Sequence, residues 1–180
     1  MKKLIFTYGI IGGLVPASWF LISEGLLPDS VSLNIRLWLG YTSMIVAFAA
    51  IFVAVKQYRD NFGGGHVTFG KALRIGLLVT LVASTLYVVV WLISYPLLFP
   101  NYFEKYMAMM KLQMQAEGKS AAAISQELAA TAKFREMYKN PVFNILLTYS
   151  EIVPVGVVIS LIAALILKNK PKPKPVPANA

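Results

Sequence analysis

The sequence predicts an all-α integral membrane protein, in which four helices form a bundle and a helical hairpin lies on the extracytoplasmic side. Hydrophobic residues make up 57% of the 180 residues and charged residues 14%, whereas soluble domains hold about 45–50% and about 25%. The apolar residues gather in four runs that reach the roughly 20 residues needed to cross a hydrocarbon core. The basic residues gather in the segments between and beyond these runs.

The four predicted spans are residues 4–27, 37–55, 75–99 and 142–167. Proline interrupts the first span at Pro16 and the fourth at Pro154. Membrane helices tolerate such breaks, because neighbouring helices and Ser/Thr hydroxyls satisfy the freed backbone groups. The four-span interpretation therefore stands despite the prolines.

Basic residues predict the orientation of the spans. Those that precede span one, separate spans two and three, or follow span four are Lys2, Lys3, Lys56, Arg59, Lys71, Arg74, Lys168, Lys170, Lys172 and Lys174. The short segment on the opposite side, residues 28–36, contains one basic residue, Arg36. Cytoplasmic loops carry an excess of Lys and Arg, so both termini and the middle loop are expected in the cytoplasm.

The N-terminus also resembles a cleaved signal peptide. Two lysines precede an apolar stretch that ends in Val15-Pro16-Ala17, a small-residue sequence typical of a cleavage site. The apolar run continues through residues 19–22 to spanning length, which favours an uncleaved span. Cleavage remains the alternative and would leave the orientation of the other three spans unchanged.

Composition argues against several kinds of site. The chain has no cysteine and a single histidine, His66, so thiolate and histidine metal sites are not expected. The formal charge of +9 is assigned to membrane topology rather than to nucleic-acid binding. We therefore predict no metal, no cofactor and no nucleic-acid partner.

The stretch GHVTFGKA, residues 65–72, comes within one residue of the pattern G-x-x-x-x-G-K-[ST] and fails at Ala72. A phosphate-binding loop follows a β-strand, and its last hydroxyl binds Mg²⁺. Here the stretch lies in a short loop between two spans, so no nucleotide is expected. The glycines at 63–65 predict a tight turn with positive φ, and Thr68 is predicted to cap the third helix.

The same loop resembles a known family. The resemblance is carried by the run FVAVKQYRDNFGGGHVTFGKALRIGL, residues 52–77, by the four spans, and by a Met- and Ala-rich segment before the last span. Its most specific part is residues 58–72. The chain is similar, up to its Lys/Pro tail, to small bacterial membrane proteins catalogued only as a domain of unknown function. The resemblance implies a multi-pass protein of the bacterial inner membrane and brings no catalytic residues. The tail itself, residues 169–180, is predicted to be disordered.

Residues 101–139 are predicted to form the outer hairpin. Its first helix repeats Phe103, Tyr106, Met107, Met110 and Met114 at three- and four-residue steps, Gly118 breaks the pattern, and a second helix covers about 120–138 up to Asn140-Pro141. Two interpretations remain open. The Met-rich face packs within the hairpin and on the bundle, which is the default, or it offers an adaptable surface to a protein partner or to a second copy. Metal binding by the methionines is disfavoured, because no histidine or cysteine accompanies them.

Two carboxylates lie in otherwise apolar spans. Glu24 is near the outer end of span one, and Glu151 lies roughly 13 Å into span four at about 1.5 Å per residue. Such residues cost about 2.5–3.5 kcal/mol at a helix centre on insertion scales, so they are candidate functional residues. The candidate intramembrane polar site consists of Glu151, Ser150, Tyr149, Thr148, Glu24 and Arg36.

Structural roles compete with functional ones at this site. Glu24 is expected to pair with Arg36 at the outer surface, and that interpretation is favoured for Glu24. For Glu151 a hydrogen-bonded structural role and a functional role stay equally open. Pro154 frees the carbonyl of Ser150, which makes this part of span four more polar.

The expected function is non-enzymatic, with the chain acting by association as a subunit, stabiliser or assembly factor in the lipid bilayer. The alternative is a small oligomeric transporter or channel that uses Glu151 as a proton or cation site, because broken helices beside a carboxylate are typical of such sites. An enzyme acting on lipid is disfavoured, because the Ser, Tyr and Glu of TYSE have no evident base beside them.

Overall fold

The computed structural model describes residues 1–28 and 30–169, and this part of the chain forms six α-helices and no β-strand. The helices are α1 (Lys2–Leu26), α2 (Leu33–Asn61), α3 (Phe69–Leu98), α4 (Tyr102–Ala116), α5 (Ala121–Tyr138) and α6 (Pro141–Leu167). Four of them, α1, α2, α3 and α6, are long and apolar enough to span a membrane. The predicted all-α fold with four spans is confirmed. The predicted disordered tail lies, from residue 170 onward, outside the described residues.

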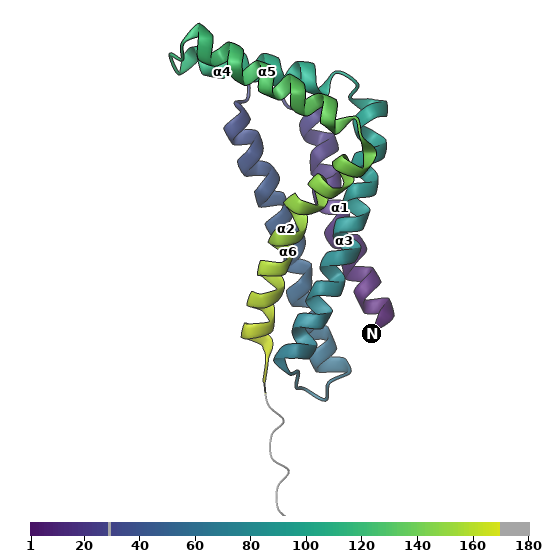
Figure 1. Cartoon of the computed structure of the whole chain (residues 1–180). Helices are drawn as coiled ribbons and strands as arrows, with labels where there is room; N and C mark the ends of the chain where they lie inside the picture. Colours follow the sequence, from purple (N-terminus) through teal and green to yellow (C-terminus); the bar gives the residue numbers. More distant parts are fainter. Residues whose placement is uncertain (29, 170–180) are drawn as a thin grey trace, which may run out of the picture.

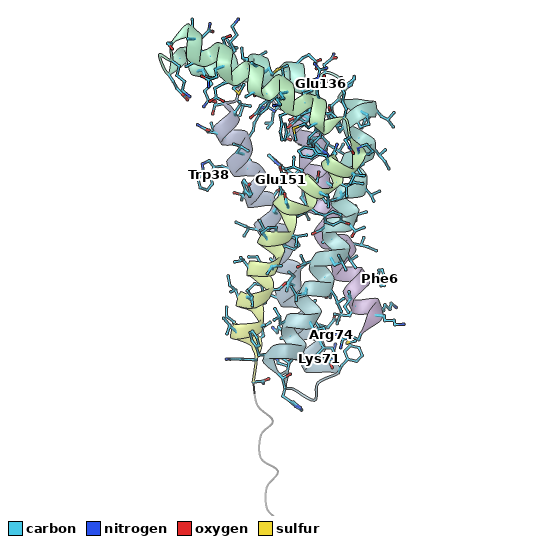
Figure 2. All side chains as sticks on the ribbon, in the orientation of Figure 1. Phe6, Trp38, Lys71, Arg74, Glu136 and Glu151 are labelled. Atoms are coloured by element: carbon cyan, nitrogen blue, oxygen red, sulfur yellow. The ribbon has the colours of Figure 1, made fainter. Side chains whose placement is uncertain are left out.

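The four long helices run side by side, and the α4–α5 hairpin lies across one end of them (Figure 1). The N-terminus, the loop between α2 and α3, and the last turn of α6 lie at the other end. We call these the hairpin end and the loop end. The basic residues Lys71 and Arg74 lie at the loop end, as Figure 2 shows.

Three of the long helices, α2, α3 and α6, begin at polar capping residues rather than at the limits of the apolar runs. The Ser32 hydroxyl accepts a hydrogen bond from the Ile35 backbone N–H (3.4 Å), so α2 begins before its apolar run. Thr68 caps α3 as predicted, accepting from the Lys71 N–H (3.4 Å). Asn140 caps α6 by accepting from the Val142 N–H (2.9 Å). The helices are therefore longer than the stretches that hydropathy marks as membrane-embedded.

At the loop end the bundle is closed by a small-residue seam between α3 and α6, made of Gly76, Thr80, Gly156 and Ser160. A Cβ added to Gly76 would lie 2.7 Å from the Ser160 Oγ, and one added to Gly156 would lie 2.7 Å from the Thr80 Oγ1. The two hydroxyls lie 3.2 Å apart. Small residues let membrane helices approach closely, and the hydroxyls satisfy one another at the contact. Around the seam, the fully buried apolar side chains are Phe48, Ile51, Ile75, Val79 and Ile152.

The α2–α3 loop is fastened to the end of α6 by Asn169. Its side-chain amide donates to the Gly65 carbonyl (2.8 Å) and its Oδ1 accepts from the Val67 N–H (2.9 Å). Gly64 and Gly65 have φ values of +60° and +81°, as the glycine-rich turn predicts. Gly63 does not share the positive φ. It is needed because an added Cβ would lie 3.0 Å from a backbone carbonyl of α2.

The hairpin packs through the face that carries its methionines. Met114 of α4 and Ile124 of α5 are buried, and the Thr131 hydroxyl lies 3.9 Å from the Met110 sulfur. Gly118, with φ +73°, forms the turn between the two helices. The half-buried methionines of the same face are Met107, Met109 and Met110. Most of the Met-rich face therefore serves packing inside the hairpin and over the bundle.

Candidate functional site

An aromatic cluster joins the hairpin to the bundle. Its closest pairs by ring centroid are Phe20–Trp91 (4.5 Å), Phe103–Tyr138 (5.3 Å), Phe20–Phe99 (5.4 Å), and Trp91–Tyr95, Trp91–Tyr102 and Tyr95–Tyr138 (5.6 Å each). The rings come from α1, α3, α4 and α5 and from the residue that follows α3. Aromatic pairs contribute about 0.5–1.5 kcal/mol each beyond the area they bury, so the cluster fixes the hairpin in place.

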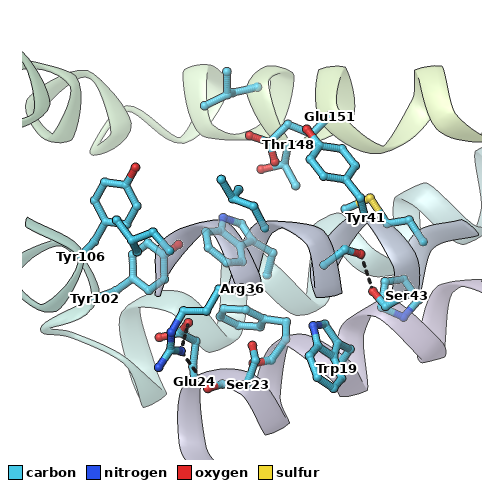
Figure 3. A pocket seen from close by; sticks show the side chains of 18 of the residues that line it. Trp19, Ser23, Glu24, Arg36, Tyr41, Ser43, Tyr102, Tyr106, Thr148 and Glu151 are labelled. Atoms are coloured by element: carbon cyan, nitrogen blue, oxygen red, sulfur yellow. Dashed lines mark hydrogen bonds and ion pairs between the residues drawn. The ribbon is translucent and has the colours of Figure 1, made fainter. Parts of the chain in front are cut away.

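Beneath the hairpin the bundle encloses a cavity of about 400 Å³, which we call the hairpin pocket (Figure 3). All six helices contribute to its walls. The polar and aromatic side chains that line it are Trp19, Phe20, Ser23, Glu24, Arg36, Tyr41, Ser43, Tyr87, Trp91, Tyr102, Phe103, Tyr106, Thr131, Phe134, Tyr138, Thr148 and Glu151. We call the aromatic rings in this list the aromatic wall of the pocket. The pocket therefore combines an aromatic wall with three charged side chains, Glu24, Arg36 and Glu151.

The pocket opens sideways between α2 and α6. Leu37 and Tyr41 of α2 line it yet are 58% and 47% exposed, and Glu151 of α6 is also exposed. Pro154 has no N–H to donate to the Ser150 carbonyl, and α6 changes direction along its length in Figure 1. The two helices meet in the loop-end half, where Phe48 lies next to Gly156, and separate toward the hairpin end.

Glu24 and Arg36 meet on one side of the pocket, with 3.7 Å between the Glu24 Oε1 and the Arg36 Nη1. Their side chains are only 12% and 9% exposed, so the pair is buried rather than at the surface as expected. The last carbonyls of a helix have no partner within it, and a cation there is favourable. Arg36 supplies that cation to the end of α1.

Four backbone carbonyls accept hydrogen bonds from the Arg36 guanidinium. They belong to Ser23 (3.2 Å), Leu27 (3.3 Å), Pro28 (2.8 Å) and Val31 (3.3 Å). The guanidinium has five N–H groups, and four are used in these bonds while Nη1 also faces Glu24. Arg36 therefore holds the α1–α2 turn together and has little donor capacity left for a ligand.

Glu151 and Thr148 point into the pocket from α6, three residues apart on one face of the helix (Figure 3). The Thr148 hydroxyl donates to the Asn144 carbonyl (2.8 Å), and the Asn144 Oδ1 accepts from the Trp91 Nε1 (3.1 Å). Within residues 1–28 and 30–169, Glu151 makes no hydrogen bond and no ion pair. It is the pocket's one charged group without a protein partner in this part of the chain.

Tyr149 and Ser150 do not line the pocket, although they were predicted to belong to the intramembrane polar site. The Tyr149 hydroxyl donates to the Thr85 Oγ1 of α3 (2.8 Å), and the Ser150 hydroxyl donates to the Leu147 carbonyl of its own helix (2.7 Å). Successive helical residues are about 100° apart at 3.6 residues per turn, so four in a row cannot share a face. The structure brings together four of the six predicted residues: Glu24, Arg36, Thr148 and Glu151.

A family model described as "Protein of unknown function (DUF4199)" matches residues 7–169. The chain belongs to this family. The resemblance to a family of unknown function over nearly the whole chain is thereby confirmed. No match was found among curated proteins or among solved structures.

Sequence reasoning on this DUF4199 chain missed the aromatic wall and Asn144. A signal for Asn144 was present, because Asn144, Thr148 and Glu151 recur at i, i+4 and i+7, one face of a helix. The wall leaves no such signal, since its rings come from helices far apart in the sequence. Among the described residues, no group of three or more His, Cys, Asp or Glu side chains could hold a metal ion.

Burial disfavours ionisation of two tyrosines at the hairpin side of the pocket. It raises the pKa of the Tyr102 and Tyr138 phenols well above their ordinary value, since the charged form would lose its hydration. Both rings therefore stay neutral, and each offers an apolar face with one hydroxyl.

Proposed function

We propose that the chain is a non-enzymatic integral membrane protein that acts by association, as a subunit, stabiliser or assembly factor, and that its partner molecule enters the hairpin pocket. The pocket carries this proposal. Its volume of about 400 Å³ lies within the roughly 300–1,000 Å³ of typical ligand sites. An aromatic wall and one carboxylate without a protein partner converge in it, which is the usual composition of a binding site.

The chemistry of the pocket supports binding over catalysis. The chain has no cysteine, and its single histidine, His66, lies in the α2–α3 loop at the loop end. The pocket's hydroxyl groups have no imidazole beside them, and Ser and Tyr are weak nucleophiles without an adjacent base. Glu24, the second carboxylate, faces Arg36.

The hairpin pocket also supports a second candidate, a small oligomeric transporter or channel with Glu151 as its cation or proton site. Glu151 lies three residues before the break at Pro154, an arrangement used by transporter sites. Against it, the small-residue seam and the fully buried Ile51, Ile75 and Ile152 close the loop-end half below the pocket. Flux through one chain would require these helices to separate.

For orientation, we propose the inner membrane of a bacterium, with the hairpin outside the cytoplasm and both termini inside. The basic residues at the loop end support this orientation, because positively charged loops stay in the cytoplasm. The hairpin end would then place the pocket mouth in the outer half of the bilayer.

Native mass spectrometry of the chain, extracted gently from its own membrane, tests the proposal. We expect a stoichiometric companion, either a second protein or an amphipathic small molecule. A bare chain without any companion overturns association. A self-oligomer alone favours the transporter, and proteoliposome flux is then compared between the wild type and Glu151→Gln. Flux that Glu151→Gln abolishes without loss of stability would establish transport.

A further inference from the structure

We propose that the hairpin pocket binds the ammonium group of an amphipathic molecule, with Glu151 as its counter-ion, the aromatic wall around it, and its apolar tail leaving between α2 and α6. This inference rests on the proposed function, because it names the chemical class of the molecule that enters the pocket. It is carried by the charge, the rings and the opening of the pocket.

The charge of the lining favours a cation. Among the described residues that line the pocket, Arg36 is the only basic side chain, and its N–H groups are engaged by four carbonyls and by Glu24. A phosphate or carboxylate would find no available guanidinium or ammonium donor there. Glu24 is compensated by Arg36, so Glu151 is left as the net charge of the pocket.

Glu151 gains most from such a ligand. A carboxylate in a membrane span is unfavourable when it has no counter-charge, and no described side chain forms an ion pair or hydrogen bond with Glu151. An ammonium group would supply the missing charge. If it carries N–H groups, it would also form a charge-assisted hydrogen bond, which is stronger than a neutral one.

Two aromatic rings that line the pocket suit the same group. Cations bind over the faces of Trp and Tyr rings, and quaternary ammonium ligands are held this way. Trp19 and Tyr41 line the pocket, and neither packs against another aromatic ring within residues 1–28 and 30–169. Figure 3 shows Tyr41 and Glu151 among the side chains that line the pocket, and they come from α2 and α6. The Trp19 and Tyr41 rings and the Glu151 carboxylate therefore line the same cavity.

The opening between α2 and α6 indicates why the ligand should be amphipathic. Exposed apolar residues on the α2 side, including Leu37, border the mouth, and Trp38 points outward beside it (Figure 2). A cavity of about 400 Å³ accommodates a head group and the start of a chain rather than a whole lipid. The tail would lie along α2 in the bilayer.

The test uses the full chain with Trp38→Phe, so that only the two pocket tryptophans, Trp19 and Trp91, report by fluorescence. The chain is placed in nanodiscs of digalactosyldiacylglycerol, a lipid without ammonium or net charge, and titrated with dodecyltrimethylammonium. We expect a saturable change in emission. Dodecanol, with the same tail and no charge, should give no saturable change, and an equal response to both overturns the proposal.

The second part of the test is a substitution of the proposed counter-ion, Glu151. Glu151→Gln should weaken dodecyltrimethylammonium binding at least tenfold, while Glu136→Gln, at an exposed hairpin glutamate, should leave it unchanged. Glu151 has no described partner to lose, so its variant is expected to fold, which circular dichroism checks. Equal affinity in Glu151→Gln and the wild type overturns the proposal.

The ammonium group could belong to a lipid head group or to a free amphiphile. Native mass spectrometry of the protein from nanodiscs of phosphatidylethanolamine or phosphatidylglycerol distinguishes these two sources. Retention of phosphatidylethanolamine by the wild type, lost in Glu151→Gln, supports a lipid head group. Saturable dodecyltrimethylammonium binding without lipid retention supports a free amphiphile. A companion protein together with no ammonium binding would overturn this inference and leave the proposed function standing.

Discussion

The two halves of the bundle use the same helices in different ways. At the loop end, α3 and α6 approach through glycine, serine and threonine, and the interior is filled by apolar side chains. At the hairpin end, α2 and α6 separate, aromatic rings replace small residues, and a cavity remains. The comparison indicates that the two halves are held by different contacts: close approach of small residues at the loop end, and aromatic rings with the buried Glu24–Arg36 pair around a cavity at the hairpin end. The following substitutions test these contacts.

Arg36→Met is expected to have the largest effect. It leaves Glu24 without this buried counter-ion and leaves the carbonyls at the end of α1 without their donors, and breaking a buried ion pair typically costs about 3–5 kcal/mol. The free energy of unfolding, measured by steric trapping in bicelles, checks the loss. Arg59→Met, at an exposed pair on α2, serves as the control and should change stability little. Equal effects of the two variants would contradict the structural role of Arg36.

Gly156→Ala tests the closed half. The added Cβ would lie 2.7 Å from the Thr80 Oγ1 and 2.9 Å from the Phe48 ring, so α3 and α6 must move apart, and such overpacking costs about 1–3 kcal/mol. The same unfolding measurement applies. Gly25→Ala is the matched control, because no atom lies within 4 Å of an added Cβ there. If Gly156→Ala proved as stable as Gly25→Ala, the seam would not be the contact that closes this half.

Tyr149→Phe should have the smallest effect and sharpens the boundary of the pocket. It removes one hydrogen bond, to the Thr85 hydroxyl, and such bonds between membrane helices contribute about 0.6 kcal/mol on average. Because Tyr149 lies outside the pocket, the affinity for dodecyltrimethylammonium should stay at the wild-type value in the same fluorescence titration. A tenfold weaker affinity would show that the pocket extends around α6.

Much of the fold was predictable from the sequence, because four apolar runs and the caps Thr68 and Asn140 are local signals. Helix ends were less so, since hydropathy marks the part of a helix that lies in hydrocarbon and not the helix itself. Thus α2 continues through the polar residues Lys56 and Arg59, beyond the predicted end of its span.

The site was predictable only in part. Glu24, Arg36 and Glu151 stood out as charges near or within apolar spans, which is a one-dimensional signal. That Arg36 donates to four carbonyls depends on how the chain brings Ser23, Leu27, Pro28 and Val31 around it, and the aromatic wall depends on which faces of α1, α3, α4 and α5 meet. Such relations arise from packing in three dimensions and leave little trace in the order of residues.

Asn169 has a mechanical consequence for the pocket at the far end of the same helix. It fixes the last turn of α6 to the α2–α3 loop, and the small-residue seam holds the helix as far as Gly156. The loop-end part of α6 therefore cannot slide or turn without breaking these contacts. The segment from Pro141 to Val153, which carries Glu151, is bound to α3 by the hydrogen bonds of Asn144 with Trp91 and of Tyr149 with Thr85. A change in the width of the mouth on the α6 side would therefore require these bonds to break or α3 to move with this segment.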